Sequence, residues 1–211
     1  MNEKAREFFT AMALEENLTE ESVKINKGNN HSQEDAEFLL QYLTKESSVL
    51  DLASGTGLLI NKIYPHIKRV VAVELFEEFT QFIEQAPNVT VVHDDIMTFT
   101  SEEQFDLVTF FGIMNYLSIE EAYNVYDKYY HNVKPQGKII IKQQFGVHED
   151  VHVRTRVGDN KKEYYSQYRT IATESELLRN IGYHDIEVVD IYPPCYNRWD
   201  NTHFYALIAH V

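Results

Sequence analysis

The stretch VLDLASGTG, residues 49–57, decides how this chain folds. A short apolar run passes into a turn of small residues, and the apolar-rich segment LLINKIY (58–64) follows, a pattern typical of a strand, a tight turn and a helix. Gly55 and Gly57 let the backbone approach a ligand that a Cβ would keep away, and the helix start behind them offers free amides. The stretch therefore predicts a ligand-binding turn at the carboxyl end of a parallel strand.

Strands and helices alternate beyond this turn. Runs rich in Val and Ile, typical of buried parallel strands, recur at 48–53, 69–75, 89–95, 105–112 and 138–145. Helical patterns between several of them indicate an α/β sheet with right-handed crossovers. Two further runs, 185–192 and 202–211, are joined by the loop 193–201 without a helix, so they should pair antiparallel.

The helices and one insertion complete the predicted organisation. Helical periodicity is found at 3–17, 33–44, 76–86, 119–133 and 173–183. Thr173 is the predicted N-cap of the last helix, with Glu176 completing a capping box. The first two helices belong to an N-terminal segment, residues 1–46, that we expect to cover the ligand site. Residues 146–172 form an insertion, in which 151–157 and 161–171 predict a β-hairpin around the turn GDN.

Composition and charge limit which classes of protein this chain can belong to. The chain has 211 residues, 44% of them hydrophobic, which fits a single domain over 1–211 because domains commonly hold about 100–200 residues. Lys and Arg number 19 against 33 Asp and Glu, giving a net charge of −14. Such a charge argues against nucleic acids and anionic membranes as partners.

Neither a membrane span nor a signal peptide is predicted. No apolar run approaches the roughly 20 residues that cross a bilayer, and the N-terminus lacks a basic start followed by an apolar core. Cys195 is the single cysteine, which excludes an internal disulfide and a cysteine zinc cluster. We therefore expect a cytoplasmic protein.

The residues around the turn discriminate between ligands. A nicotinamide fingerprint requires G-x-G-x-x-G, but Ile60 stands where the third glycine would be. Asp51, four residues before Gly55, disfavours a pyrophosphate and favours a cationic or hydroxyl-bearing ligand. A dehydrogenase with a degenerate fingerprint stays open as an alternative, to be tested by nicotinamide binding.

At this point the chain resembles the class I S-adenosylmethionine-dependent methyltransferases. Their first motif is D/E-x-G-x-G-x-G, often DLGCGTG, and here it is DLASGTG. Ala53 replaces the first glycine, which is compatible with the motif if its φ is negative. The resemblance implies a Rossmann-like, doubly wound and mostly parallel seven-stranded sheet with an antiparallel last strand, and S-adenosylmethionine as cofactor.

The resemblance also implies the residues that bind this cofactor. Glu74 stands where the family binds the two ribose hydroxyls, and Asp95 and Ile96 in HDDI (93–96) match the adenine-binding corner. FDLVTFFGIMNYLS (105–118) matches the motif that lines the methionine end, and KPQGKIII (134–141) the loop into the fifth strand. The expected cofactor-binding residues are Asp51, Ala53, Ser54, Gly55, Gly57, Glu74, Leu75, Asp95, Ile96 and Phe111.

The hairpin insertion is the predicted acceptor side. In a strand over 148–157, one face carries His148, Asp150, His152, Arg154 and Arg156. The arginines suggest an anionic acceptor, and His148 or His152 is the candidate general base. Tyr168 and Trp199 are further candidates for acceptor binding. Two alternatives remain: the basic face is ordinary solvent-exposed surface, or the histidines and Asp150 bind a metal, which we do not expect because no fourth ligand is evident.

These observations predict an enzyme that methylates an oxygen or nitrogen of a small polar, anionic metabolite, such as a sugar or a nucleotide-linked sugar. An RNA or protein methyltransferase is the alternative. The negative charge and the absence of an NPPY-like stretch after the fourth strand disfavour methylation of nucleic-acid bases. A non-catalytic cofactor-binding module of the same fold is a further alternative, and a homodimer is left open.

Overall fold

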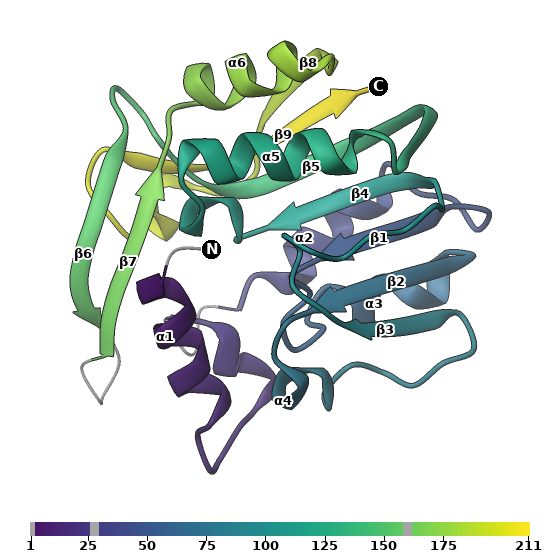
Figure 1. Cartoon of the computed structure of the whole chain (residues 1–211), viewed down its shortest axis with the longest axis horizontal. Helices are drawn as coiled ribbons and strands as arrows, with labels where there is room; N and C mark the ends of the chain where they lie inside the picture. Colours follow the sequence, from purple (N-terminus) through teal and green to yellow (C-terminus); the bar gives the residue numbers. More distant parts are fainter. Residues whose placement is uncertain (1–2, 26–29, 158–161) are drawn as a thin grey trace.

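The computed structural model describes residues 3–25, 30–157 and 162–211, and within them seven strands form one sheet (Figure 1). The strand order is β3-β2-β1-β4-β5-β9-β8. The strands are β1 Ser48–Leu52, β2 Arg69–Glu74, β3 Val89–His93, β4 Phe105–Phe111, β5 Val133–Gly146, β8 His184–Asp190 and β9 Thr202–His210. Neighbours from β3 to β5 pair parallel, and β9 pairs antiparallel with both β5 and β8. The predicted fold class is confirmed, and the strand order reverses at β1, between β2 and β4.

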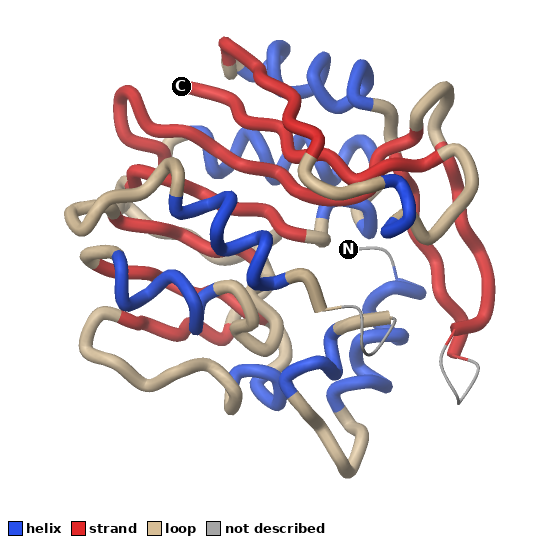
Figure 2. Tube along the Cα trace, turned by 180° about the vertical axis from the view of Figure 1, so that it is seen from behind, coloured by secondary structure: helices blue, strands red, loops and turns tan. Residues whose placement is uncertain are grey.

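Helices cover both faces of this sheet, which is why β1 is buried along its whole length (Figures 1 and 2). The helices are α1 Glu3–Ala13, α2 Ser32–Leu40, α3 Ile60–Ile63, α4 Glu77–Thr80, α5 Ile119–Tyr130 and α6 Ile171–Ile181. One core cluster packs Phe8 of α1, Tyr126 of α5 and Leu178 of α6 against the sheet. The other packs Leu39 of α2 and Ile60 of α3 against the opposite face. No helix of the described residues is long and apolar enough to cross a membrane.

Several predicted helices are too long. α1 ends at Ala13 instead of 17, α2 occupies 32–40 instead of 33–44, and α5 ends at Tyr130 instead of 133. The helix expected over 76–86 shrinks to α4, because the Asn61 side chain bonds the backbone that would continue it. Its Nδ2 donates to the Phe82 carbonyl at 2.8 Å, and its Oδ1 accepts from the Glu84 amide at 2.9 Å.

The last helix begins earlier than predicted. Its N-cap is Thr170, whose Oγ1 accepts from the Thr173 amide at 3.1 Å. The predicted capping box of Thr173 and Glu176 is therefore wrong, because Thr173 already lies in the first turn. β5 also begins earlier, at Val133, and so includes Pro135.

The insertion forms the predicted hairpin of β6 Val151–Val157 and β7 Lys162–Tyr168, beside α1 (Figure 1). Its predicted turn, with Lys161, lies outside the described residues. Tyr164 is buried and meets the Phe8 ring edge-on at 5.5 Å between centroids. Beyond the hairpin, the Arg169 guanidinium forms a buried ion pair with Glu174 at 2.5 Å and donates to the Met114 carbonyl at 2.8 Å. The insertion is thus joined to the main core.

Candidate active site

The turn after β1 is built from residues in the left-handed region of backbone space. Ala53, Gly55 and Gly57 have φ of 62°, 56° and 77°. The negative φ expected for Ala53 is therefore wrong, and a non-glycine residue there costs about 1–2 kcal/mol. The Ser54 hydroxyl donates to the Asp51 carbonyl at 2.9 Å, which holds the turn closed.

The two glycines have different surroundings. A Cβ on Gly57 would lie 2.7 Å from Cγ1 of Ile83, and Gly57 does not line the cavity described below. The structure thus places Gly57 in close packing against Ile83, and its predicted role in cofactor binding stays a prediction. A Cβ on Gly55 would lie 3.2 Å from Cγ1 of Val23, so it would point at the N-terminal segment.

A single cavity collects the other predicted cofactor residues. It opens at the carboxyl ends of the parallel strands, beside the reversal of strand order, where ligands of such sheets bind. Nine of the ten predicted residues line it: Asp51, Ala53, Ser54, Gly55, Glu74, Leu75, Asp95, Ile96 and Phe111. They come from the ends of β1, β2 and β4 and from the segment after β3.

Glu74 is held in a fixed orientation at the end of β2. Its Oε2 accepts from the Gly55 amide at 2.7 Å and its Oε1 from the Phe76 amide at 2.9 Å. A carboxylate has about four acceptor sites, so each oxygen keeps one for a ligand hydroxyl. Burial raises the pKa of Glu74, and the two amide bonds oppose that shift. The arrangement suits a ligand with two neighbouring hydroxyls.

Other acids surround this half of the cavity. Asp51 is buried and accepts from the Thr109 hydroxyl at 2.5 Å, while burial raises the pKa of its carboxyl. Asp94 and Asp95 also line the cavity. Asp95 accepts from the Met97 amide through Oδ1 at 3.0 Å and from the Arg6 guanidinium of α1 through Oδ2. Four carboxyl groups therefore face one end, which we name the acidic half.

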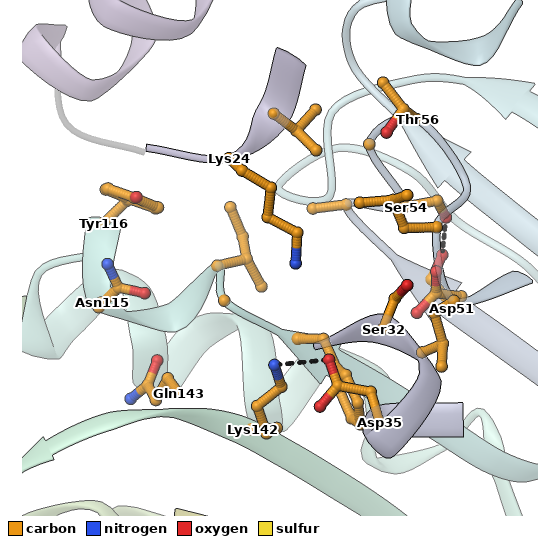
Figure 3. Close-up of a pocket in the computed structure, with 18 of the residues that line it drawn as sticks. Lys24, Ser32, Asp35, Asp51, Ser54, Thr56, Asn115, Tyr116, Lys142 and Gln143 are labelled. Carbon is orange, nitrogen blue, oxygen red and sulfur yellow. Dashed lines mark hydrogen bonds and ion pairs between the residues drawn. The ribbon is translucent and has the colours of Figure 1, made fainter. Parts of the chain in front are cut away.

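A second group of lining residues carries cations, and we name it the basic half; Figure 3 shows two of them, Lys24 and Lys142. Lys142 of β5 forms an ion pair with Asp35 of α2 at 2.8 Å, and the Tyr192 hydroxyl donates to the same carboxylate. Arg198 donates through Nε to Oε1 of Gln144 at 2.9 Å. These residues come from three segments that are distant in sequence: α2, β5 and the connection between β8 and β9.

Lys24 completes the basic half. Its side chain enters the cavity from the wall opposite β5 (Figure 3), and it has no ion-pair partner among the described residues. Burial, together with the positive charges of Lys142 and Arg198, lowers the pKa of Lys24 to about 8. Within the described residues, the Lys24 ammonium therefore forms no ion pair, although Asp35 and Glu21 are near enough to favour its charge.

The hairpin residues predicted to bind the acceptor lie outside this cavity. His148, His152, Arg154 and Arg156 are exposed, and none of them lines it. Arg154 instead pairs through Nε with Glu163 across the hairpin at 2.9 Å. The apolar side of the hairpin turns inward because it packs on α1, so the basic side faces solvent. No cluster of potential metal ligands is present in the described part of the chain.

Tyr168 and Trp199 also lie outside the cavity lining. The Trp199 indole donates to the Tyr168 hydroxyl at 3.0 Å and stacks on Tyr164, with 6.0 Å between ring centroids. Both side chains are thus part of the packing behind the hairpin. From the same loop, Tyr196 and Arg198 do reach the cavity.

Sequence reasoning missed most of the basic half. The missed lining residues include Lys24, Asp35, Lys142, Gln143, Gln144 and Tyr192. One signal was available: in KIIIKQQF (138–145) three polar residues follow an apolar strand core, at the end where ligands of parallel sheets bind.

The reversed strand order and the acid-lined cavity beside it define an α/β protein with a ligand site at the switch point of its sheet. Residues 49–137 match the sequence model of a family described as a methyltransferase domain. The matched residues include the first motif and the ends of β2 and β4, and the match agrees with the class I, S-adenosylmethionine-dependent type that the motif resembles. No curated protein matches the chain by sequence.

Solved structures with this fold include three methyltransferases. The 1,6-didemethyltoxoflavin-N1-methyltransferase of Burkholderia thailandensis, with bound 1,6-didemethyltoxoflavin and S-adenosylhomocysteine, is 16% identical over 98% of this chain and 86% of its own (TM-score 0.74). The glycopeptide N-methyltransferase MtfA with S-adenosylmethionine is 14% identical over 88% and 96% (TM-score 0.70). An S-adenosylmethionine-dependent methyltransferase from Clostridium acetobutylicum is 16% identical over 88% and 94% (TM-score 0.66).

Proposed function

We propose that this protein transfers the methyl group of S-adenosylmethionine to an oxygen or nitrogen atom of a small, polar, anionic acceptor. The observation that carries the proposal is the division of one cavity into an acidic and a basic half. S-adenosylmethionine is a cation at its sulfonium and amino groups, so carboxylates favour it. An anionic acceptor is favoured by the lysines and arginine at the other end.

The acidic half fits the donor through residues whose orientation is already set. Glu74 is fixed by two backbone amides with acceptor sites left for the two ribose hydroxyls. Asp95, which the resemblance assigns to the adenine amino group, lines the same cavity as the turn 53–55. S-adenosylmethionine supplies an electrophilic methyl group: the acceptor's lone pair forms the new bond to carbon as the carbon–sulfur bond breaks, leaving S-adenosylhomocysteine.

The basic half supports anionic character in the acceptor. Lys24, Lys142 and Arg198 contribute three positive charges against one from Asp35, in a chain whose net charge is −14. Holding such an acceptor in line with the methyl group accounts for much of the rate of a displacement. The hairpin arginines first suggested an anionic acceptor. In the structure the support for an anionic acceptor comes instead from Lys24, Lys142 and Arg198. The sugar or nucleotide-linked sugar expected from the sequence stays a prediction, and the lining of the basic half favours a different acceptor, argued in the next subsection. A small molecule in preference to RNA or protein is part of the proposal.

Calorimetric titration with S-adenosylhomocysteine tests the donor site. Glu74→Gln replaces an acceptor oxygen with a donor amide, and losing a hydrogen bond to a charged group costs about 1.5–3 kcal/mol. We expect the affinity to fall at least about tenfold. Glu78→Gln, an exposed residue of α4, is the matched control and should bind like wild type. Wild-type protein that does not bind S-adenosylhomocysteine, or Glu74→Gln with unchanged affinity, would contradict the proposed site.

A further inference from the structure

Gln143 of β5 carries an amide group that nothing in the described protein satisfies. The side chain lines the cavity, the residue is 2% exposed, and neither Nε2 nor Oε1 has a hydrogen-bond partner among the described residues. In the part of the chain that the structure describes, the other buried side-chain atoms without a partner belong to Ser166 and Asn197, which lie outside the cavity. Buried polar groups are usually paired, so the position of Gln143 indicates that a ligand completes its hydrogen bonds.

An unpaired amide specifies the chemistry of its partner. It offers one acceptor oxygen and a donor nitrogen side by side in one plane. A ligand satisfies both when it presents a donor next to an acceptor, as the edge of a lactam, an imide or a carboxamide does. The neighbouring Gln144 makes a useful contrast, because its amide already bonds Thr202 at 2.5 Å and Arg198 at 2.9 Å.

Lys24, on the opposite wall of the cavity, sets a second requirement for the ligand, namely a negative charge. Lys142 is neutralised by Asp35 and Arg198 is held by Gln144, whereas Lys24 has no such partner among the described residues. Figure 3 shows Lys24 and Gln143 on opposite sides of the cavity. Aromatic rings line the space as well, among them Phe111, Tyr116 and Phe204. An occupant of this half therefore meets an ammonium, an amide and apolar ring surfaces.

We propose that Gln143 and Lys24 together select the acceptor, and that this acceptor is a planar anion with an amide-type edge. Gln143 pairs with the lactam, imide or carboxamide edge, and Lys24 binds the anionic group. The proposal rests on the proposed methyltransferase function, because it assigns the basic half to the acceptor.

Three small probes separate the two interactions. Orotate has both an imide edge and a carboxylate, benzoate has the carboxylate alone, and uracil has the imide edge alone. Each is titrated by ligand-observed NMR into full-length protein saturated with S-adenosylhomocysteine. We expect orotate to bind at least about tenfold more tightly than either benzoate or uracil, because it engages both residues.

Two variants assign the effects to residues. Gln143→Met keeps the shape and loses both hydrogen bonds, so the advantage of orotate over benzoate should shrink about tenfold while benzoate binds as before. Lys24→Met should remove the advantage of orotate over uracil. Lys68→Met, an exposed lysine before β2, is the control and should leave all three affinities unchanged.

Thermal stability shows whether Gln143 has a structural role instead. Gln143→Met removes two unpaired buried groups, so the variant should melt no lower than wild type. Gln144→Met, the same substitution one residue later, leaves Arg198 and Thr202 without their hydrogen-bond partner. This variant should have a lower melting temperature than wild type. A lower melting temperature of Gln143→Met together with an unchanged orotate-to-benzoate ratio would overturn the proposal.

The controls distinguish failure of this inference from failure of the proposed function. If the protein binds S-adenosylhomocysteine but orotate binds no better than benzoate, or does not bind at millimolar concentration, the inference is wrong and the proposed function stands. If S-adenosylhomocysteine itself does not bind, the proposed function fails first.

Discussion

At the scale of single residues, Ala53 has an unfavourable backbone conformation in the turn after β1. With φ of 62° its Cβ is crowded in the left-handed region, a cost of about 1–2 kcal/mol that glycine avoids. Glycine also makes the unfolded chain more flexible, which offsets part of the gain. We expect Ala53→Gly to raise the free energy of unfolding by about 0.5–1 kcal/mol.

Chemical denaturation measures that change. Ala72→Gly, at a buried position in the extended strand β2, is the control and should destabilise the protein. A loss of stability in Ala53→Gly as well would show that the methyl group contributes more through packing than it costs through backbone strain.

Lys24 gives the basic half a defined pH dependence. The pKa of Lys24 is lowered to about 8 by burial and by the positive charges of Lys142 and Arg198, while Asp35 and Glu21 oppose the shift. Below pH 8 the ammonium is charged and attracts an anion, and above pH 8 the amine is neutral. Orotate affinity should therefore fall as pH rises through about 8, or somewhat higher once the bound anion stabilises the charge.

Titration of orotate between pH 6.5 and 9.5 checks this expectation. Lys24→Met should bind orotate weakly and almost independently of pH over that range. An affinity of wild type that stays constant up to pH 9.5 would show that Lys24 remains charged or does not contact the anion.

At the scale of elements, α1 stands between the hairpin and the acidic half. Its Arg6 contacts Asp95, and its Lys4 contacts Glu163 of β7 at 3.1 Å. Since the resemblance assigns the Asp95 carboxylate to the adenine amino group, Arg6 competes for the same group. We expect Arg6→Ala to strengthen S-adenosylhomocysteine binding up to about fivefold, the range of an exposed ion pair.

The second ion pair of α1 provides the control. Lys4→Ala removes a similar surface contact away from the cavity, and calorimetry should show unchanged affinity. If Arg6→Ala weakens binding as much as Asp95→Ala does, Arg6 positions the carboxylate instead of competing for it.

The elements also show where sequence reasoning succeeds and where it fails. The strands β1 and β2 were predicted well because they are mostly apolar and buried almost throughout. Helix ends were predicted poorly because distant side chains determine them. Asn61 ends α4 by bonding Phe82 and Glu84, and no local pattern around residue 80 reveals that contact.

At the scale of the whole molecule, the two halves of the cavity differ in how far the sequence predicts them. The residues of the acidic half stand at the ends of strands that are consecutive in the sequence. Sequence motifs taken in order along the chain therefore locate them. The basic half joins Lys24, Asp35, Gln143 and Arg198, which are spread over most of the chain. In the hairpin, the alternation of basic and apolar residues correctly predicted two different faces. The basic face points to solvent because the apolar face packs on α1.

The same packing makes the insertion part of one cooperative structure. Glu174 is fully buried, pairs with Arg169 and accepts from the Tyr126 hydroxyl, while Arg169 also donates to the Met114 carbonyl. Glu174→Ala leaves a buried guanidinium without a counter-charge, which costs about 3–5 kcal/mol. For a protein of this size that lowers the melting temperature by roughly 6–20 °C.

Two spectroscopic probes show whether the loss of stability in Glu174→Ala affects the whole molecule. Trp199, the single tryptophan, stacks on Tyr164 of the hairpin and reports on the insertion by fluorescence. Far-UV circular dichroism reports on the sheet and helices. Because Arg169 joins the hairpin to the main core, we expect both transitions to coincide in wild type and to shift together in Glu174→Ala. A fluorescence transition that moves down alone would mean that the hairpin unfolds independently of the sheet.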